Sequence, residues 1–113
     1  MHSRIKSFLL VSALLGLTSC ATVGKPIEFG GPETITVGST TKNDIYQQYG
    51  EPFRVGFDNG NLKWTYGYYK VRMFGDTDTQ DLAITFDKKG LVKDYTYSSS
   101  VPIEKKKLLQ ANN

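Results

Sequence analysis

Hydrophobic and polar positions alternate over most of the second half of this chain, as they do in strands that bury one face of a sheet. Short segments rich in Gly and Asn separate the alternating runs and favour tight turns, above all the Asn-Gly pair within residues 58–61 and Gly90 within residues 87–90. Turn-linked runs of this kind predict an antiparallel meander of three to four strands. The predicted strands are residues 53–57, 62–73, 82–86 and 91–97.

Residues 42–49 follow the helical period instead, because apolar and aromatic side chains recur there four positions apart. Thr41 is a natural N-cap, and Asp44 places an acid in the positively polarised first turn. Gly50 favours the positive φ that ends helices, and Pro52 follows it. A helix this short is not stable alone, so it must pack on the sheet. The sequence therefore predicts a small two-layer α+β domain.

The N-terminus has the pattern of a targeting signal. Arg4 and Lys6 precede ten apolar or small residues at 8–17, "FLLVSALLGL", and small residues follow this run. This order is typical of a secretory signal peptide. The run is too short for a membrane-spanning helix, which needs about 20 apolar residues.

Cys20 is the only cysteine, and it ends the motif Leu17-Thr18-Ser19-Cys20, which resembles the bacterial lipobox. The resemblance implies cleavage before Cys20 and a diacylglycerol on its sulfur. Stable anchoring takes more than one acyl chain, which such a lipid supplies. Ala21 after the cysteine implies, again by resemblance, delivery to the outer membrane. The alternative is ordinary cleavage after Ser19-x-Ala21, which would discard Cys20 and release the protein from the membrane.

Glycine and proline are frequent between the signal and the helix, so we expect a tether without regular structure, apart from a short edge strand at residues 33–37. The C-terminal residues are expected to be flexible. The predicted divisions are a signal peptide at 1–19, a lipid-anchored tether at 20–34, an α+β domain at 35–98 and a tail at 99–113.

Charge and composition exclude several function classes. The net charge of +3 falls to +1 when Arg4 and Lys6 leave with the signal, so nucleic-acid binding is not predicted. The single histidine, His2, also lies in the signal. Without histidine or a free thiol, the domain lacks the usual nucleophiles, general bases and zinc ligands. The sequence therefore predicts a protein that is not an enzyme and needs no cofactor.

One acidic stretch has oxygen-bearing side chains at the spacing of a calcium-binding loop. Its sixth position is Asp81, where that loop needs glycine, and predicted strands flank it instead of helices. A solvated hairpin loop at residues 74–81 is the favoured interpretation, and no metal site is predicted. The positions that match the calcium pattern are Asp76, Asp78, Gln80 and Asp87.

Tyrosines on the predicted strands are candidates for a partner surface. Neighbouring residues of a strand point to opposite faces, so one of Tyr68 and Tyr69 should lie outside the core. Exposed aromatic clusters on a sheet are typical of interaction sites, whereas we expect Trp64 and Phe86 in the core. The candidate partner-binding residues are Tyr68, Tyr69, Tyr95 and Tyr97.

The order of the motifs resembles the SmpA/OmlA domain family, the family of the outer-membrane assembly lipoprotein BamE. The shared elements are a lipobox, "I-x-V-G", a Thr-capped short helix, "G-x-P", "W-x-Y" and "L-x-I-x-F-D-x-x-G". The matching residues are Ile35, Val37, Gly38, Thr41, Ile45, Tyr49, Gly50, Pro52, Trp64, Tyr66, Leu82, Ile84, Phe86 and Gly90.

The resemblance implies a non-enzymatic periplasmic domain, tethered to the inner leaflet of the outer membrane. Such a domain supports the machinery that inserts β-barrels by binding partner subunits and phosphatidylglycerol. Lysines 105–107 offer a second place for an anionic headgroup, although a solvated tail is the commoner explanation.

A departure from the family pattern keeps a second function open. The family usually has another helix before its "I-x-x-G" motif, and here "EFGGPET" at residues 28–34 takes that place. The alternative is a lipoprotein that uses the same small sheet to bind and regulate or inhibit another envelope protein or a ligand.

Overall fold

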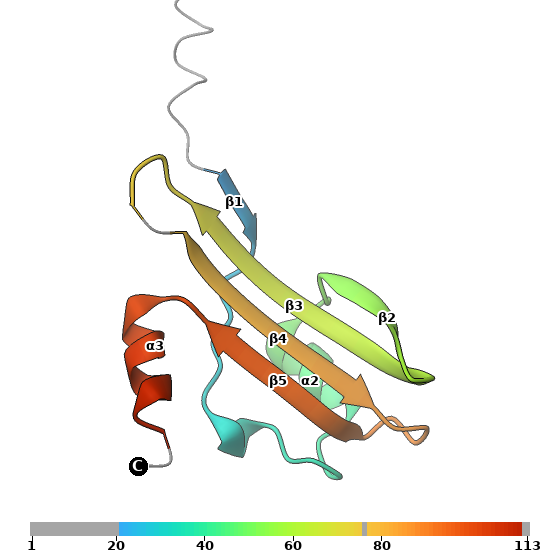
Figure 1. The fold of residues 1–113 in the computed structure, drawn as a ribbon. Coiled ribbons are helices and arrows are strands. Elements are labelled where there is room, and N and C mark those ends of the chain that lie inside the picture. Colours follow the sequence, from blue (N-terminus) through green and yellow to red (C-terminus); the bar gives the residue numbers. More distant parts are fainter. Residues whose placement is uncertain (1–20, 76, 112–113) are drawn as a thin grey trace, which may run out of the picture.

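The computed structural model of the chain describes residues 21–75 and 77–111 (Figure 1). Five strands form one antiparallel sheet: β1, β3, β4 and β5 lie in that order, and β2 pairs with residues 61–65 of β3 on the same side as β1. The strands are β1 (Ala21–Gly24), β2 (Arg54–Asp58), β3 (Asn61–Val71), β4 (Asp78–Phe86) and β5 (Val92–Ser99). The helices are the 3-10 turn η1 (Pro32–Thr34) and the α-helices α2 (Lys42–Tyr49) and α3 (Pro102–Leu109).

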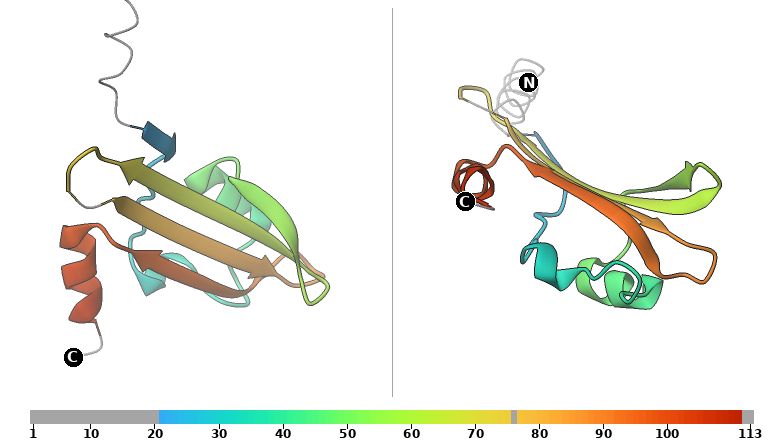
Figure 2. Two further views of the ribbon diagram at one scale, coloured as in Figure 1. Left: turned by 45° about the horizontal axis from the view of Figure 1, so that its top comes forward. Right: turned by 60° about the horizontal axis from the view of Figure 1, so that its bottom comes forward.

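Helix α2, η1 and the chain between β1 and η1 all lie on one face of the sheet, as the right-hand view of Figure 2 shows. The core lies between these layers, and Ile45 is the one helical side chain of α2 that it buries. The predicted two-layer α+β class is confirmed, with β1 added to the sheet. The buried apolar side chains are Ile27, Ile35, Ile45, Tyr66, Leu82, Ile84, Phe86 and Val92. Trp64, also expected in the core, is half-buried against Phe86.

The N-terminus of α2 is closed by a capping box. The Thr41 hydroxyl accepts a hydrogen bond from the Asp44 amide at 3.1 Å, and the Asp44 carboxylate accepts one from the Thr41 amide at 3.0 Å. Two of the free amides of the first turn are thereby satisfied. The helix begins and ends at the residues that the sequence predicts.

Gly50 ends the helix and also ties it to the sheet. Its φ of 79° and ψ of −151° belong to a region that only glycine occupies without strain. The Gly50 amide donates to the Tyr46 carbonyl at 2.8 Å, and the Gly50 carbonyl accepts from the Tyr66 hydroxyl of β3 at 2.8 Å. These two hydrogen bonds, one to the helix and one to the sheet, therefore fix the direction in which the chain leaves the helix.

The Gly50→Ala substitution should lower the free energy of unfolding by about 1–3 kcal/mol, the cost of forcing a Cβ into this backbone region. Gly56→Ala is the matched control, because Gly56 lacks a positive φ and an added Cβ meets no atom within 4 Å at either site. Urea unfolding of both variants measures the difference. Equal stability of the two variants would show that the backbone of residue 50 is not strained.

The predicted turns are present. Asn59 and Gly60 have φ values of 51° and 81°, which identifies the two-residue β2–β3 turn as type I′. Gly90, with a φ of 83°, makes the turn between β4 and β5. The predicted loop at residues 74–81 is shorter in the structure, because β4 already begins at Asp78.

The predicted edge strand at residues 33–37 is wrong. Pro32 starts η1 there, and the amides of Ser39 and Thr40 both bond back to the Thr36 carbonyl, so the chain turns instead of extending. Ile35 enters the core while Val37 stays exposed. The apolar alternation in this segment reflects one buried contact within a turn, not a pleated strand.

The prediction that residues 20–34 contain no regular element is also corrected, since β1 pairs with the last four residues of β3. At the end of β1, Gly24 crosses the β3 backbone so closely that an added Cβ would lie 2.1 Å from the Gly67 carbonyl oxygen. Beyond it, Ile27 and Phe29 cover a part of the sheet that the two-turn helix α2 does not reach. The predicted tether therefore forms part of the packed domain.

The C-terminal segment differs from the prediction of a flexible tail in the same way. β5 continues to Ser99, and α3 follows with Pro102 in its first turn, where the missing amide costs nothing. Helix α3 buries none of its residues completely. Its contact with the sheet is polar and is made by Glu104, which hydrogen-bonds with Gln80 and Tyr97.

Candidate functional site

A buried glutamine holds the segment after β1 against the sheet. Gln80, 5% exposed, uses both ends of its amide on the backbone of Ile27. The Ile27 amide donates to Oε1 at 2.9 Å, and Nε2 donates to the Ile27 carbonyl at 2.8 Å. This pair of bonds replaces the ladder hydrogen bonds that the segment would make in a strand.

The same glutamine connects to α3. Its Nε2 lies 2.9 Å from the Tyr97 hydroxyl and 2.8 Å from a Glu104 carboxylate oxygen. Tyr97 and Ser99 donate their hydroxyl protons to Glu104 at 2.8 and 2.7 Å. Burial, followed by the hydrogen bond to Glu104, raises the pKa of Tyr97 to about 12.

This cluster was missed by sequence reasoning, although one signal for it exists. Gln80 lies two positions before Leu82, in register with the buried side chains of β4. A polar residue at an inward position of a strand needs a buried partner. The sequence contains no signal that those partners are Ile27 and Glu104, each more than 20 residues away.

The structure separates the four candidate tyrosines. Tyr68, Tyr95 and Tyr97 lie on the face that carries α2, because they pair with Gln80, Ile84 and Leu82 across the sheet. Phe29 covers two of them, stacking on Tyr97 with the ring centroids 4.3 Å apart and tilting toward Tyr95 at 6.0 Å. These three tyrosines therefore pack under the chain that follows β1, and only Tyr69 lies on the opposite face.

No helix or strand within residues 21–75 and 77–111 covers that opposite face, which we call the open face (Figure 2). Tyr69 lies across Gly67 there and donates to the Asp81 carboxylate, a hydrogen bond that raises the pKa of Tyr69. The ring of Phe53 meets Tyr69 edge-on at 6.4 Å, and Val23 is its neighbour on β1. This end of the open face is accessible and combines aromatic and aliphatic side chains with the Asp81 carboxylate.

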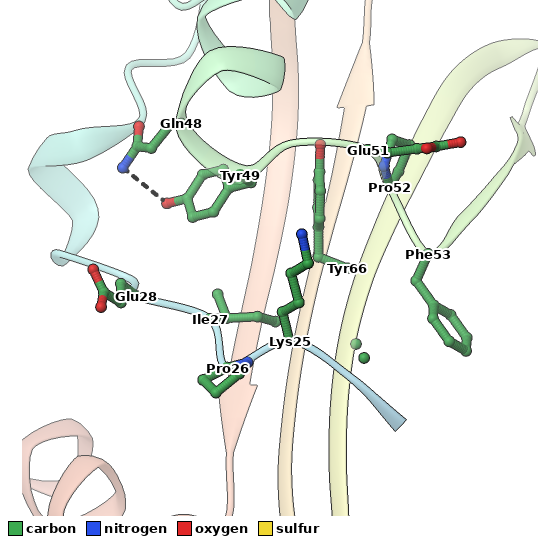
Figure 3. A pocket seen from close by; sticks show the side chains of 12 residues that line it. Lys25, Pro26, Ile27, Glu28, Gln48, Tyr49, Glu51, Pro52, Phe53 and Tyr66 are labelled. Carbon is green, nitrogen blue, oxygen red and sulfur yellow. Dashed lines mark hydrogen bonds between the residues drawn. The ribbon is translucent and has the colours of Figure 1, made fainter. Parts of the chain in front are cut away.

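A groove of about 570 Å³ runs between the segment Gly24–Glu28 and the end of α2 (Figure 3). Tyr66 lines it, and burial raises the pKa of this tyrosine to about 12. Lys25 projects into the groove toward the Tyr66 hydroxyl end in Figure 3. The lining residues are Gly24, Lys25, Pro26, Ile27, Glu28, Gln48, Tyr49, Glu51, Pro52, Phe53, Tyr66 and Gly67. Aromatic walls with charges of both signs suit a peptide or protein segment.

Within residues 21–75 and 77–111, no three His, Cys, Asp or Glu side chains gather as a metal site, and no helix is long and apolar enough to cross a bilayer. The residues at calcium-loop spacing have other contacts. Asp78 bonds Arg72 at 2.7 Å, and Asp87 accepts from the amides of Lys89 and Leu91 in its turn. Asp76 and the proposed attachment residue Cys20 lie outside the described residues.

Comparison with protein families gives a match to the outer membrane protein assembly factor BamE domain over residues 33–96. The chain belongs to the BamE family. The match spans α2, β2, β3 and β4 completely and most of η1 and β5, and it confirms the resemblance drawn from the sequence motifs. Comparisons with curated proteins and with solved structures yield no significant match.

Membership in the BamE family connects the chain with the assembly of outer-membrane proteins and with assembly factors that are generally not enzymes. One wall of the groove, at the end of α2, lies inside the matched span, whereas Gly24–Glu28 lies outside it. The groove is therefore formed where the segment before the matched span packs against residues within it.

Proposed function

We propose that this protein is an outer-membrane lipoprotein, anchored through Cys20, that serves as a non-enzymatic accessory of β-barrel assembly on the periplasmic face. The observation that carries the proposal is the BamE-domain match over residues 33–96. The lipobox at residues 17–20 supports the anchor, and the groove beside α2 supports binding of a protein segment.

A partner that binds at Phe53 would contact both the groove and the open face. It lines the groove and also contacts Tyr69 of the open face, and half of its side chain is exposed. An exposed aromatic residue beside a groove is the usual centre of a binding surface. Of the tyrosines predicted for partner binding, Tyr69 adjoins this position, so the proposal retains Tyr69 as a contact.

Affinity capture from detergent-solubilised membranes tests the proposal. The intact lipoprotein should recover subunits of the β-barrel assembly machinery, and Phe53→Ser should reduce that recovery about tenfold through loss of a central aromatic contact. Phe57→Ser is the matched control, because Phe57 is a second exposed phenylalanine of the β2 hairpin and lines neither the groove nor the open face.

Recovery of no assembly subunit would contradict the assembly role, and equal losses in the two variants would contradict the assignment of Phe53. Capture of one other envelope protein as the main partner would instead favour the regulatory or inhibitory alternative. The 3-10 turn Pro32–Thr34, where the family pattern has a helix, supports that alternative.

Anionic phospholipid is proposed as a second, weaker ligand. Lysines 105–107 form one exposed cationic stretch on α3, and each lysine near an anionic membrane surface adds attraction. Glu104, the acid next to them, is already occupied by Gln80, Tyr97 and Ser99.

A further inference from the structure

The tip of the β3–β4 hairpin exposes two large apolar side chains side by side. Phe74 is 87% exposed and Met73 is 75% exposed. Exposed apolar neighbours of this size mark a surface that another apolar phase covers. Neither residue lines the groove or contacts the core.

The register of the sheet places this tip beside the start of β1, which follows the proposed attachment residue Cys20 in the chain. Ala21 pairs with Val71, the last residue of β3, and residue 20 is joined to Ala21 by a peptide bond. Paired Cα atoms lie about 5 Å apart, so Ala21, the residue that follows Cys20 in the chain, lies beside Val71. Three further residues lead to Phe74, a span of at most about 11 Å. Figure 1 shows β1 and the hairpin tip at the same end of the sheet.

The surface between the tip and the open face is also apolar. Val71 and Val23 are each about half exposed, and both lie on the face that carries Tyr69. Among the nearby charges, Arg72 bonds Asp78 and Lys70 faces the same aspartate across the sheet, so one positive charge stays unbalanced beside the tip. The contact area that Met73 and Phe74 offer is itself apolar.

We propose that Met73 and Phe74 insert into the acyl region of the membrane that carries the anchor, as a second point of attachment. This inference rests on the proposed lipidation of Cys20. Acyl chains on Cys20 would hold the tip at the bilayer surface. The entropy cost of bringing the protein to the membrane would then already be met by the anchor, so the tip could insert without meeting it again. A lipid on one terminal residue leaves the domain free to rotate, whereas two adjacent contacts fix its orientation and direct the far end of the sheet into the periplasm.

Fluorescence quenching by lipids brominated on their acyl chains tests the insertion. The mature lipidated protein is reconstituted as the parent, as Phe74→Trp and as Phe57→Trp, with native Trp64 as a common background. Phe57 is 78% exposed and belongs to the β2–β3 hairpin at the opposite end of β3. We expect the indole of Phe74→Trp to be quenched at least twofold more than that of Phe57→Trp. This difference between the variants should be present in zwitterionic vesicles as well as in phosphatidylglycerol-containing ones.

Equal quenching of the two variants would overturn the proposal, and so would quenching that requires anionic lipid, which would make the contact electrostatic. Shielding of residue 74 only when the assembly machinery is added would assign the tip to a protein partner instead. Mass spectrometry of the same samples reports the lipid on Cys20. If the protein is lipidated but the two variants are quenched equally, only the insertion of the tip is contradicted. If the protein carries no lipid, the anchor is contradicted, and the insertion that depends on it is contradicted as well.

Discussion

Replacing Gln80 with methionine should lower the free energy of unfolding by about 2–4 kcal/mol, although the side chain keeps nearly the same length and volume. The loss comes from the buried groups that Gln80 serves. The amide and carbonyl of Ile27 would lose their partners, and each unsatisfied buried polar group costs about 1–3 kcal/mol. Glu104 would lose one of its donors as well.

Equilibrium unfolding in urea measures the effect, with Gln47→Met as the control, because Gln47 is an exposed residue of helix α2. Amide hydrogen exchange gives a second readout that a general loss of packing would not produce. The Ile27 amide should lose protection far more than the amides of β4 do, because Gln80 is its bonded acceptor. An unchanged exchange rate at Ile27 would show that Gln80 does not hold this segment.

Helix α2 was predictable because its signals are local. Thr41 and Asp44 satisfy each other across three residues, and Gly50 adopts a conformation that other residues avoid. The hairpin turn at Asn59 and Gly60 is specified in the same local way. These signals can be recognised from a few neighbouring residues, although the helix needs the sheet for its stability.

The two ends of the domain were not predictable because their contacts are long-range. Ile27 is ordered by Gln80, which lies 53 residues away, and α3 by Glu104, which meets Gln80 and Tyr97. A segment rich in glycine and proline contains no local signal for such docking. A helix of two turns cannot cover the whole face of the sheet. This mismatch in size was the only hint that another segment packs there.

The candidate site shows the same division between local features, which the sequence predicts, and long-range contacts, which it does not. Alternation along β3 places Tyr68 and Tyr69 on opposite faces, as the structure has them. Which face is covered depends on Phe29, whose stacking on Tyr97 requires the chain after β1 to fold back. The groove likewise needs both Gly24–Glu28 and α2 in place, and no sequence pattern links them.

The Cys20→Ala variant should accumulate as a full-length precursor, and no lipid-modified mature form should be found. No other thiol in the chain could carry the acyl chains, since Cys20 is the only cysteine. Losing the anchor removes the strong membrane affinity that two or more acyl chains supply, so any chain that escapes should fractionate as soluble. Intact-mass spectrometry of washed membranes and of the soluble fraction measures both outcomes.

Ala21→Leu is the matched control, because it distinguishes the two cleavage routes. Ordinary signal peptidase needs small residues at its cleavage site, so leucine at position 21 should block the alternative route while leaving the lipobox residues 17–20 unchanged. The side chain at position 21 is exposed on β1, so the larger residue does not disturb the core. Lipidated, membrane-bound Ala21→Leu beside unprocessed Cys20→Ala would establish the anchor. The reverse pattern would show that Cys20 is removed with the signal and that the domain acts without a covalent hold on the membrane.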